Sequence, residues 1–136
     1  MIGIDYISDH CRQFTYMGGI ERDDKRITKT AEVFTPLTLV NDMLDTLPPE
    51  VFIDETKTFI DNSCGDGQFL SEILIRKVSN GIDFEVALSS LYGVDLMPDN
   101  VERCRERLLC NQEHLRHIVE KNIVCHDAMT YDYSFN

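Results

Sequence analysis

The chain lacks the features of a membrane-spanning or secreted protein. It contains no run of about eighteen apolar residues, which a transmembrane helix would need. Its first residues, MIGIDYISDH, carry acids early, whereas a secretory signal peptide begins with basic residues and an apolar stretch. We therefore expect a cytoplasmic protein that does not bind membranes.

Basic residues are also scarce. The 136 residues include 13 Lys and Arg against 24 Asp and Glu, which gives a formal net charge of −11. A surface of this sign repels phosphate backbones, so we expect the chain alone to bind DNA weakly if at all. One locally basic cluster contains Arg22, Lys25, Arg26 and Lys29. The hydrophobic content of 43% is typical of an ordered globular domain.

No Cys-x-x-Cys pair is present among the five scattered cysteines, which predicts reduced thiols rather than a disulfide framework. A zinc site could be assembled on paper from Cys110, His114, His117 and Cys125. Their spacing matches no standard zinc finger. We therefore favour buried thiols and surface histidines at these positions.

The first thirty residues are predicted to form an N-terminal element. Ile4, Ile7, Cys11 and Phe14 recur at helical spacing and predict a short helix over residues 4–14. Gly18-Gly19 and the charged run after it predict a loop. We divide the chain into a helix with a basic loop (residues 1–30) and a main domain (residues 31–136).

Strands alternate with helices in the main domain. The pair Thr35-Pro36 predicts a helix start with a hydroxyl cap, and Pro48-Pro49 predicts its end. Short strands are predicted at residues 58–61, 91–95 and 122–125, and further helices at 68–79, 83–89 and from Pro98. This alternation predicts an α/β fold whose parallel strands lie in the order 3-2-1, flanked by helices.

The helix that begins at Pro98 carries a densely charged face. Its members are Glu102, Arg103, Arg105, Glu106 and Arg107. We interpret this face as solvated surface.

An acid ends each predicted strand: Asp61, Asp95 and Asp127. Because ligands bind at the carboxyl ends of parallel strands, these acids are expected to form one ledge. Gly65 and Gly67 follow the first acid and predict a tight turn that brings backbone close to a ligand. An acid at the second strand suits ribose hydroxyls, and one at the third suits the amino group of adenine.

The glycine loop does not match the phosphate-binding patterns. Leu70 stands where a dinucleotide fingerprint has its third glycine, and no Gly-Lys-Ser/Thr sequence is present. A cofactor with a ribose and an adenine but no phosphate fits the acidic ledge better, and a sulfonium cation would be tolerated there. These properties describe S-adenosylmethionine.

Four segments together resemble a known family. In order, EVFTPLTLVNDML, FIDNSCGDGQFL, LYGVDLMPDNVERCRERLL and NIVCHDAMTYDY resemble the S-adenosylmethionine-binding motifs of N6-adenine DNA methyltransferases. The similar group has a Phe-Thr-Pro motif before the glycine loop, as in many restriction–modification, phage and plasmid enzymes. The resemblance covers about residues 27–133 and implies a partial Rossmann-like class I methyltransferase fold.

The resemblance also implies roles for single residues. The methionine end of the cofactor would be contacted by Phe34, Thr35 and Pro36, and its main cradle would be formed by Asp61, Cys64, Gly65 and Gly67. The ribose hydroxyls would be held by Asp95, with Leu96 packed on the adenine. The adenine amino group would be bound by Asp127, with Ala128 alongside, where the family often has a bulkier residue.

The Asn/Asp-Pro-Pro-Tyr/Phe loop of the family is missing from these residues, as is a target-recognition domain. In the family that loop binds the target amino group and stacks on the flipped base. We therefore expect a domain that holds the methyl donor but is inactive alone, or is part of a split enzyme. The first strand would also lack a neighbour, which exposes Phe59 and Ile60 and predicts a second chain, a homodimer contact or a covering segment such as residues 1–30.

Two other functions remain open. A non-catalytic module could bind S-adenosylmethionine or dock on the host's methylation or restriction machinery, since an acidic surface suits a protein that grips DNA. An enzyme that degrades the cofactor would need a base, for which His126 beside Asp127 is the candidate.

Overall fold

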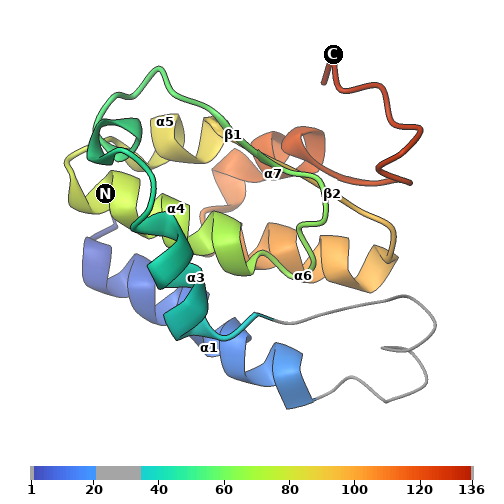
Figure 1. Ribbon diagram of the computed structural model, residues 1–136, viewed down its shortest axis with the longest axis horizontal. Coiled ribbons are helices and arrows are strands. Elements are labelled where there is room, and N and C mark those ends of the chain that lie inside the picture. Colours follow the sequence, from blue (N-terminus) through green and yellow to red (C-terminus); the bar gives the residue numbers. More distant parts are fainter. Residues whose placement is uncertain (1, 21–34, 136) are drawn as a thin grey trace.

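The computed structural model describes residues 2–20 and 35–135 (Figure 1). Three parallel strands form one sheet in the order β1 (Phe59–Asp61), β2 (Leu91–Asp95) and β3 (Ile123–Cys125). Phe59 pairs with Leu91 in the first ladder, and Gly93 pairs with Ile123 in the second. The predicted α/β class, the parallel pairing and the strand order are confirmed.

Helices cover one face of this sheet. Helices α4 (Gln68–Ser79) and α6 (Pro98–Leu109) pack on the strands, and α1 (Ile4–Ile20) and α3 (Leu37–Leu44) pack on these helices in turn. Helices α5 (Phe84–Ser89) and α7 (Arg116–Asn122) lead into β2 and β3 and pack on each other. Two short 3₁₀ turns complete the fold, η1 (Pro49–Phe52) and η2 (Glu113–Leu115).

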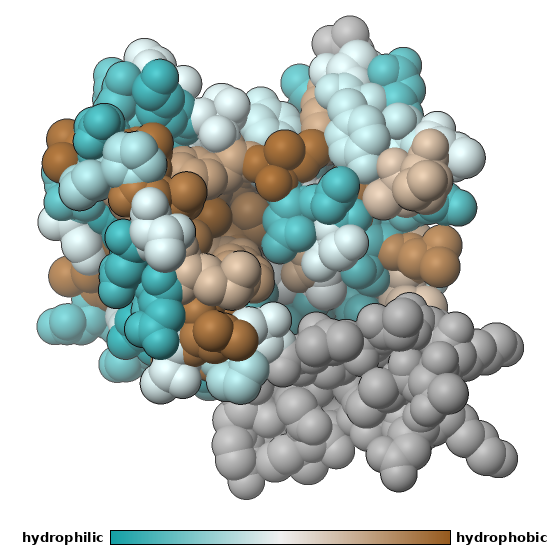
Figure 2. Space-filling model, in the orientation of Figure 1, coloured by the Kyte–Doolittle hydropathy of each residue, from teal (hydrophilic) through white to brown (hydrophobic). Residues whose placement is uncertain are grey.

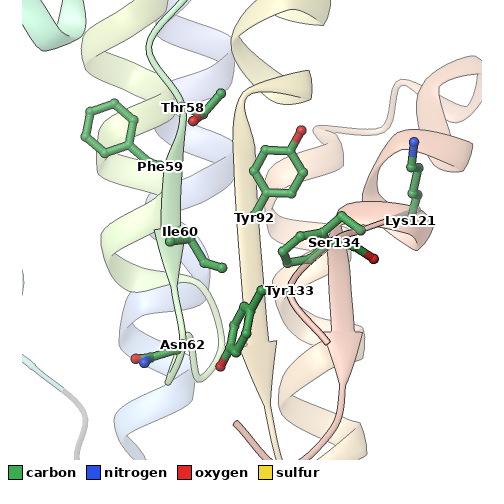
Figure 3. A pocket seen from close by; sticks show the side chains of 9 residues that line it. Thr58, Phe59, Ile60, Asn62, Tyr92, Lys121, Tyr133 and Ser134 are labelled. Atoms are coloured by element: carbon green, nitrogen blue, oxygen red, sulfur yellow. The ribbon is translucent and has the colours of Figure 1, made fainter. Parts of the chain in front are cut away.

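The opposite face of the sheet is largely open. Figure 3 looks onto this face, with Ile60 and Tyr92 on the near side and helices behind the strands. The C-terminal segment crosses part of it, where the rings of Tyr92 and Phe135 lie 4.7 Å apart. Ile60 keeps 51% of its surface exposed. Helix α1 packs chiefly on α4 and α6 and is not the segment that covers β1, and the rest of the suggested covering segment, residues 21–30, lies outside the described part.

Several predicted boundaries differ from the structure. Helix α1 runs through Gly18-Gly19 to Ile20, so the predicted loop does not begin there. The glycine penalty, about 1 kcal/mol each in a helix interior, is a weak preference that tertiary context can override. The short helix α7 and the turn before it, at residues 113–122, were not predicted.

Helix α3 begins and ends differently from the prediction. Its N-cap is Pro36, in an extended conformation, so Thr35 lies outside the helix and its hydroxyl caps nothing. The helix ends at Leu44, before the two prolines. Arg76 explains this end, because its guanidinium donates to the carbonyl of Asn41 (3.1 Å) and to the Asp45 carboxylate (2.8 Å).

The charged face of α6 is not solvated surface. Arg107 is fully buried, and its guanidinium lies 3.3 Å from the carboxylate of Asp66, which is 2% exposed. Arg105 donates to the carbonyl of Ile123 at 2.7 Å, at the start of β3. Glu102 alone of the five is exposed. The sequence pattern cannot tell a buried charged residue of a helix from an exposed one, because both recur at the same helical spacing.

Buried polar side chains join the helices elsewhere. Glu72, 1% exposed, accepts bonds from Arg12 (3.0 Å) and Asn41 (3.2 Å) and so links α1, α3 and α4. Lys77 is buried at the other end of α4 and donates to the carbonyl of Lys57 (2.6 Å) and to Ser90 Oγ (2.8 Å). Burial lowers the pKa of Lys77. These contacts place α4 relative to the starts of β1 and β2.

The buried pair predicts a large difference between two arginine variants. Arg107→Met removes the guanidinium from beside the buried Asp66 carboxylate, and we expect a loss of about 3–5 kcal/mol in the free energy of unfolding. Arg116→Met breaks an ion pair with Glu106 that is 31% and 39% exposed, and we expect a loss of about 1 kcal/mol or less. Urea denaturation of both variants measures the difference, and equal losses would contradict the burial argument.

Candidate functional site

The three acids stand at one edge of the sheet. Asp61 is the last residue of β1, Asp95 the last of β2, and Asp127 follows the end of β3 by two residues. Since the strands are parallel and adjacent, their carboxyl ends meet at this edge. The amide of His126 donates to the carbonyl of Asp95 at 2.9 Å and ties the third strand end to the second. The predicted ledge is therefore present in the fold.

The Asp95 carboxylate is held by three donors from this chain. One oxygen accepts from the amide of Gly65 at 3.1 Å, and the other accepts from the amide of Met97 (3.1 Å) and from Asn100 Nδ2 (3.2 Å). A carboxylate offers about four acceptor positions, so capacity remains for an outside donor. Asn100 is fully buried and was missed by the sequence analysis. Its place in the first turn of α6, five residues after the acid, was the available signal.

The glycine loop is fixed to β2 at two points. Besides the bond from Gly65 to Asp95, the amide of Cys64 donates to the carbonyl of Val94 at 3.0 Å. Gly65 has a φ of +54° with open space where a side chain would point, so the backbone is accessible there. Gly67 has a φ of +96° and lies against α6, where an added Cβ would come within 2.9 Å of Cys104 Sγ. The two glycines therefore serve different needs, access at Gly65 and close packing at Gly67.

Cys64 lies beneath the loop rather than on its surface. Its side chain is 4% exposed and packs against Gly93, whose added Cβ would come within 3.0 Å of it. A hydrogen bond with Cys104 and burial raise the pKa of this thiol, so it stays protonated. Cys64 can shape a cradle through its backbone, while its sulfur faces the core.

Asp61 lies in an environment that favours a cation. Burial and, to a smaller degree, the nearby charge of Asp95 raise the pKa of Asp61, against a bond from the amide of Ser63 (3.0 Å) that lowers it. A carboxylate with these properties gains from a positive ligand group beside it.

The third part of the ledge is the most exposed. Asp127 accepts from the amide of Met129 at 2.9 Å, and its side chain otherwise faces solvent. Leu96 is 60% exposed beside it on the β2 side. Ala128 is half-buried, and its carbonyl accepts from the Tyr133 hydroxyl at 2.8 Å. An apolar surface and an acceptor are thus available at this end.

The Phe-Thr-Pro segment approaches the glycine loop from α3. The carbonyl of Thr35 accepts a hydrogen bond from Gln68, the first residue of α4. Pro36 is exposed, and Phe34 lies outside the described residues. The described part of the motif is therefore close to the start of α4, where the loop ends.

The described residues contain no candidate metal site. Within residues 2–20 and 35–135, no three His, Cys, Asp or Glu side chains are grouped closely enough to hold an ion. Cys110, proposed on paper as a zinc ligand, is buried with its sulfur 3.9 Å from Cys11 Sγ.

Comparisons with known proteins add no relative. No family model, no curated protein and no solved structure matches this chain. None of the helices described has the length and apolar character that crossing a bilayer requires.

The loop geometry predicts unequal effects of two alanine substitutions. Gly81→Ala adds a Cβ into open space at a φ of +94°, and we expect a loss of about 1–2 kcal/mol from the left-handed backbone. Gly67→Ala has the same backbone problem at +96° and a clash with Cys104, which adds about 1–3 kcal/mol. Thermal or urea unfolding compares them. If Gly67→Ala is no less stable than Gly81→Ala, the loop does not pack on α6 as described.

Proposed function

We propose that this chain binds S-adenosylmethionine at the carboxyl edge of its sheet, as a Rossmann-like methyltransferase domain. One observation carries the proposal: three acids end three adjacent parallel strands, and the middle one is bonded to the glycine loop. An acidic edge disfavours phosphate, which argues against nucleotides with phosphate groups. A ligand with hydroxyls, an amino group and positive charge suits the same groups.

Each acid has a proposed partner on the cofactor. Asp95 accepts from a ribose hydroxyl with its one remaining acceptor position, while Gly65, Met97 and Asn100 keep the carboxylate oriented. Asp61 pairs with the ammonium of the methionine part, and exposed backbone at Gly65 lets that part approach. Asp127 binds the adenine amino group, with Leu96 against the ring.

The proposal is for cofactor binding and does not include methyl transfer by this chain alone. S-adenosylmethionine carries a methyl group on a sulfonium sulfur, which is open to attack by an amine. Residues 1–136 contain no Asn/Asp-Pro-Pro-Tyr/Phe loop to orient such an amine. Orientation supplies about 7–11 kcal/mol of a barrier, so methyl transfer is proposed only for an assembly in which another segment supplies that loop.

The ribose assignment predicts a loss of affinity on changing Asp95. Calorimetric titration of the full chain with S-adenosylmethionine should show binding, and Asp95→Ala should weaken it by about 1.5–3 kcal/mol through loss of a charged acceptor. Asp42→Ala removes an equally negative but exposed side chain on α3 and should leave affinity unchanged.

A second variant separates binding from folding. Asp95→Asn keeps one acceptor for the amide of Gly65, while its NH2 group faces two donors, the amide of Met97 and Asn100 Nδ2. We expect this variant to melt below the parent, to remain folded at the titration temperature as checked by circular dichroism, and to bind more weakly. Parent-like affinity in both Asp95 variants would remove the ribose assignment.

The raised pKa of Asp61 predicts a pH dependence. In the free protein this acid holds its proton at higher pH than an ordinary aspartic acid. An ammonium beside it favours the carboxylate, so cofactor binding expels the proton and affinity falls as pH is lowered through that raised pKa. Asp61→Asn should lose this pH dependence, and 5′-methylthioadenosine, which lacks the amino acid part, should not show it. Identical profiles for parent and variant would contradict the pairing.

A further inference from the structure

The outer edge of β1 is open to another strand. In the described part of the chain, β1 has β2 on one side and no strand on the other. The amide of Phe59 donates towards β2, to the carbonyl of Ser90 at 2.9 Å. Because successive residues of a strand direct their backbone groups to opposite sides, the N–H and C=O of Ile60 point outward. These groups can bond an added strand.

A hollow flanks this edge on each face of the sheet. On the open face, a hollow of about 730 Å³ lies beside Ile60, Tyr92 and Tyr133 (Figure 3). On the helical face, a hollow of about 240 Å³ lies between β1 and α4 and is lined by Phe69 and Ile73. Apolar surface borders a depression over α3, α4 and β1 (Figure 2). Successive side chains of an added strand would therefore face an apolar hollow on the helical face and a hollow of mixed polar and apolar lining on the open face.

The charged residues around the outer edge of β1 favour a partner segment with positive charge. Every arginine in the described residues is engaged within the chain: Arg12, Arg76, Arg103, Arg105, Arg107 and Arg116. Around β1 the acids Asp54, Glu55 and Asp61 outnumber the exposed lysines, Lys57 before the strand and Lys121 at the hollow on the open face. With a net charge of −11, two copies of this chain repel each other, whereas a basic segment is attracted.

We propose that the outer edge of β1 binds an extended segment of another protein as an added strand. The segment has a short apolar core, whose side chains alternate between the two hollows, and Lys or Arg at both ends. Main-chain bonds to Ile60 supply affinity, and the hollows with the flanking acids supply specificity. This inference does not depend on cofactor binding.

A synthetic peptide tests the proposal on the full chain. The probe carries alternating valines and isoleucines between paired lysines and a fluorescent label, and binding is followed by anisotropy. We expect saturable binding. A peptide with N-methyl groups at alternate positions should bind at least about tenfold more weakly, since loss of each main-chain bond removes about 1 kcal/mol.

Two matched variants locate the site. Ile60→Lys introduces a cation between the hollows, and we expect about a tenfold loss or more, from lost apolar contact and repulsion of the peptide's lysines. Ile53→Lys makes the same change at an isoleucine that is 57% exposed, against 51% for Ile60, but lines neither hollow. The control should bind like the parent, and circular dichroism confirms that both variants fold.

Four outcomes would overturn the proposal. The first is no binding of the lysine-flanked peptide by the full chain. The second is equal weakening by Ile53→Lys and Ile60→Lys, which means non-specific attraction. The third is equal affinity for a peptide flanked by glutamates. The fourth is a homodimer in sedimentation that Ile60→Lys dissociates, which would make a second copy the occupant.

Discussion

The carboxylate of Asp95 is the constraint on which the functional edge depends. It accepts from the glycine loop, from the turn after β2 and from Asn100 inside α6, and so joins the glycine loop to the start of α6, a distant part of the sequence. Together with the bond from the Cys64 amide to the Val94 carbonyl, these bonds fix the position of Gly65 relative to β2. A group that is already oriented by its own chain loses little entropy when a ligand binds. The same bonds that stabilise the loop thus prepare the acid for a ligand.

The buried ion pair between Asp66 and Arg107 holds the glycine loop against helix α6. Arg107 sits at the far end of α6 from Asn100, and its backbone carbonyl accepts from Cys11 of α1. Gly67, next to Asp66, permits the close approach of loop and helix that the pair requires. A buried pair of this kind is weak evidence for added stability, because its desolvation offsets its attraction. It does disfavour other positions of the loop, since moving the loop separates the two buried charges.

Sequence reasoning succeeded where a pattern has one structural solution. The three strands, their order and the acids at their ends follow from short apolar runs and right-handed crossovers, as do α4 and α6. It failed where one pattern allows several solutions. Arg107 and Glu102 stand on the same charged stretch, yet one is buried and the other exposed, because only tertiary packing brings Asp66 beneath α6. The end of α3 depends on Arg76, which is more than thirty residues away. The role of Asn100 depends on how α6 is placed relative to the Asp95 carboxylate, which a sequence pattern does not show.

The two faces of the sheet explain why the proposed ligand site and the proposed partner site are compatible. Helices bury one face, and their contacts orient the acids at the carboxyl edge. The other face and the outer side of β1 take no part in that orientation, as Ile60 and Tyr92 show by facing the open hollow. Asp61 is the residue common to both, since it ends β1 and lies on the ledge. A strand added beside β1 would reduce the exposure of Asp61 to water, which further raises the pKa of that acid and strengthens its preference for a cationic ligand. Coupling between the two surfaces therefore follows from the position of one side chain.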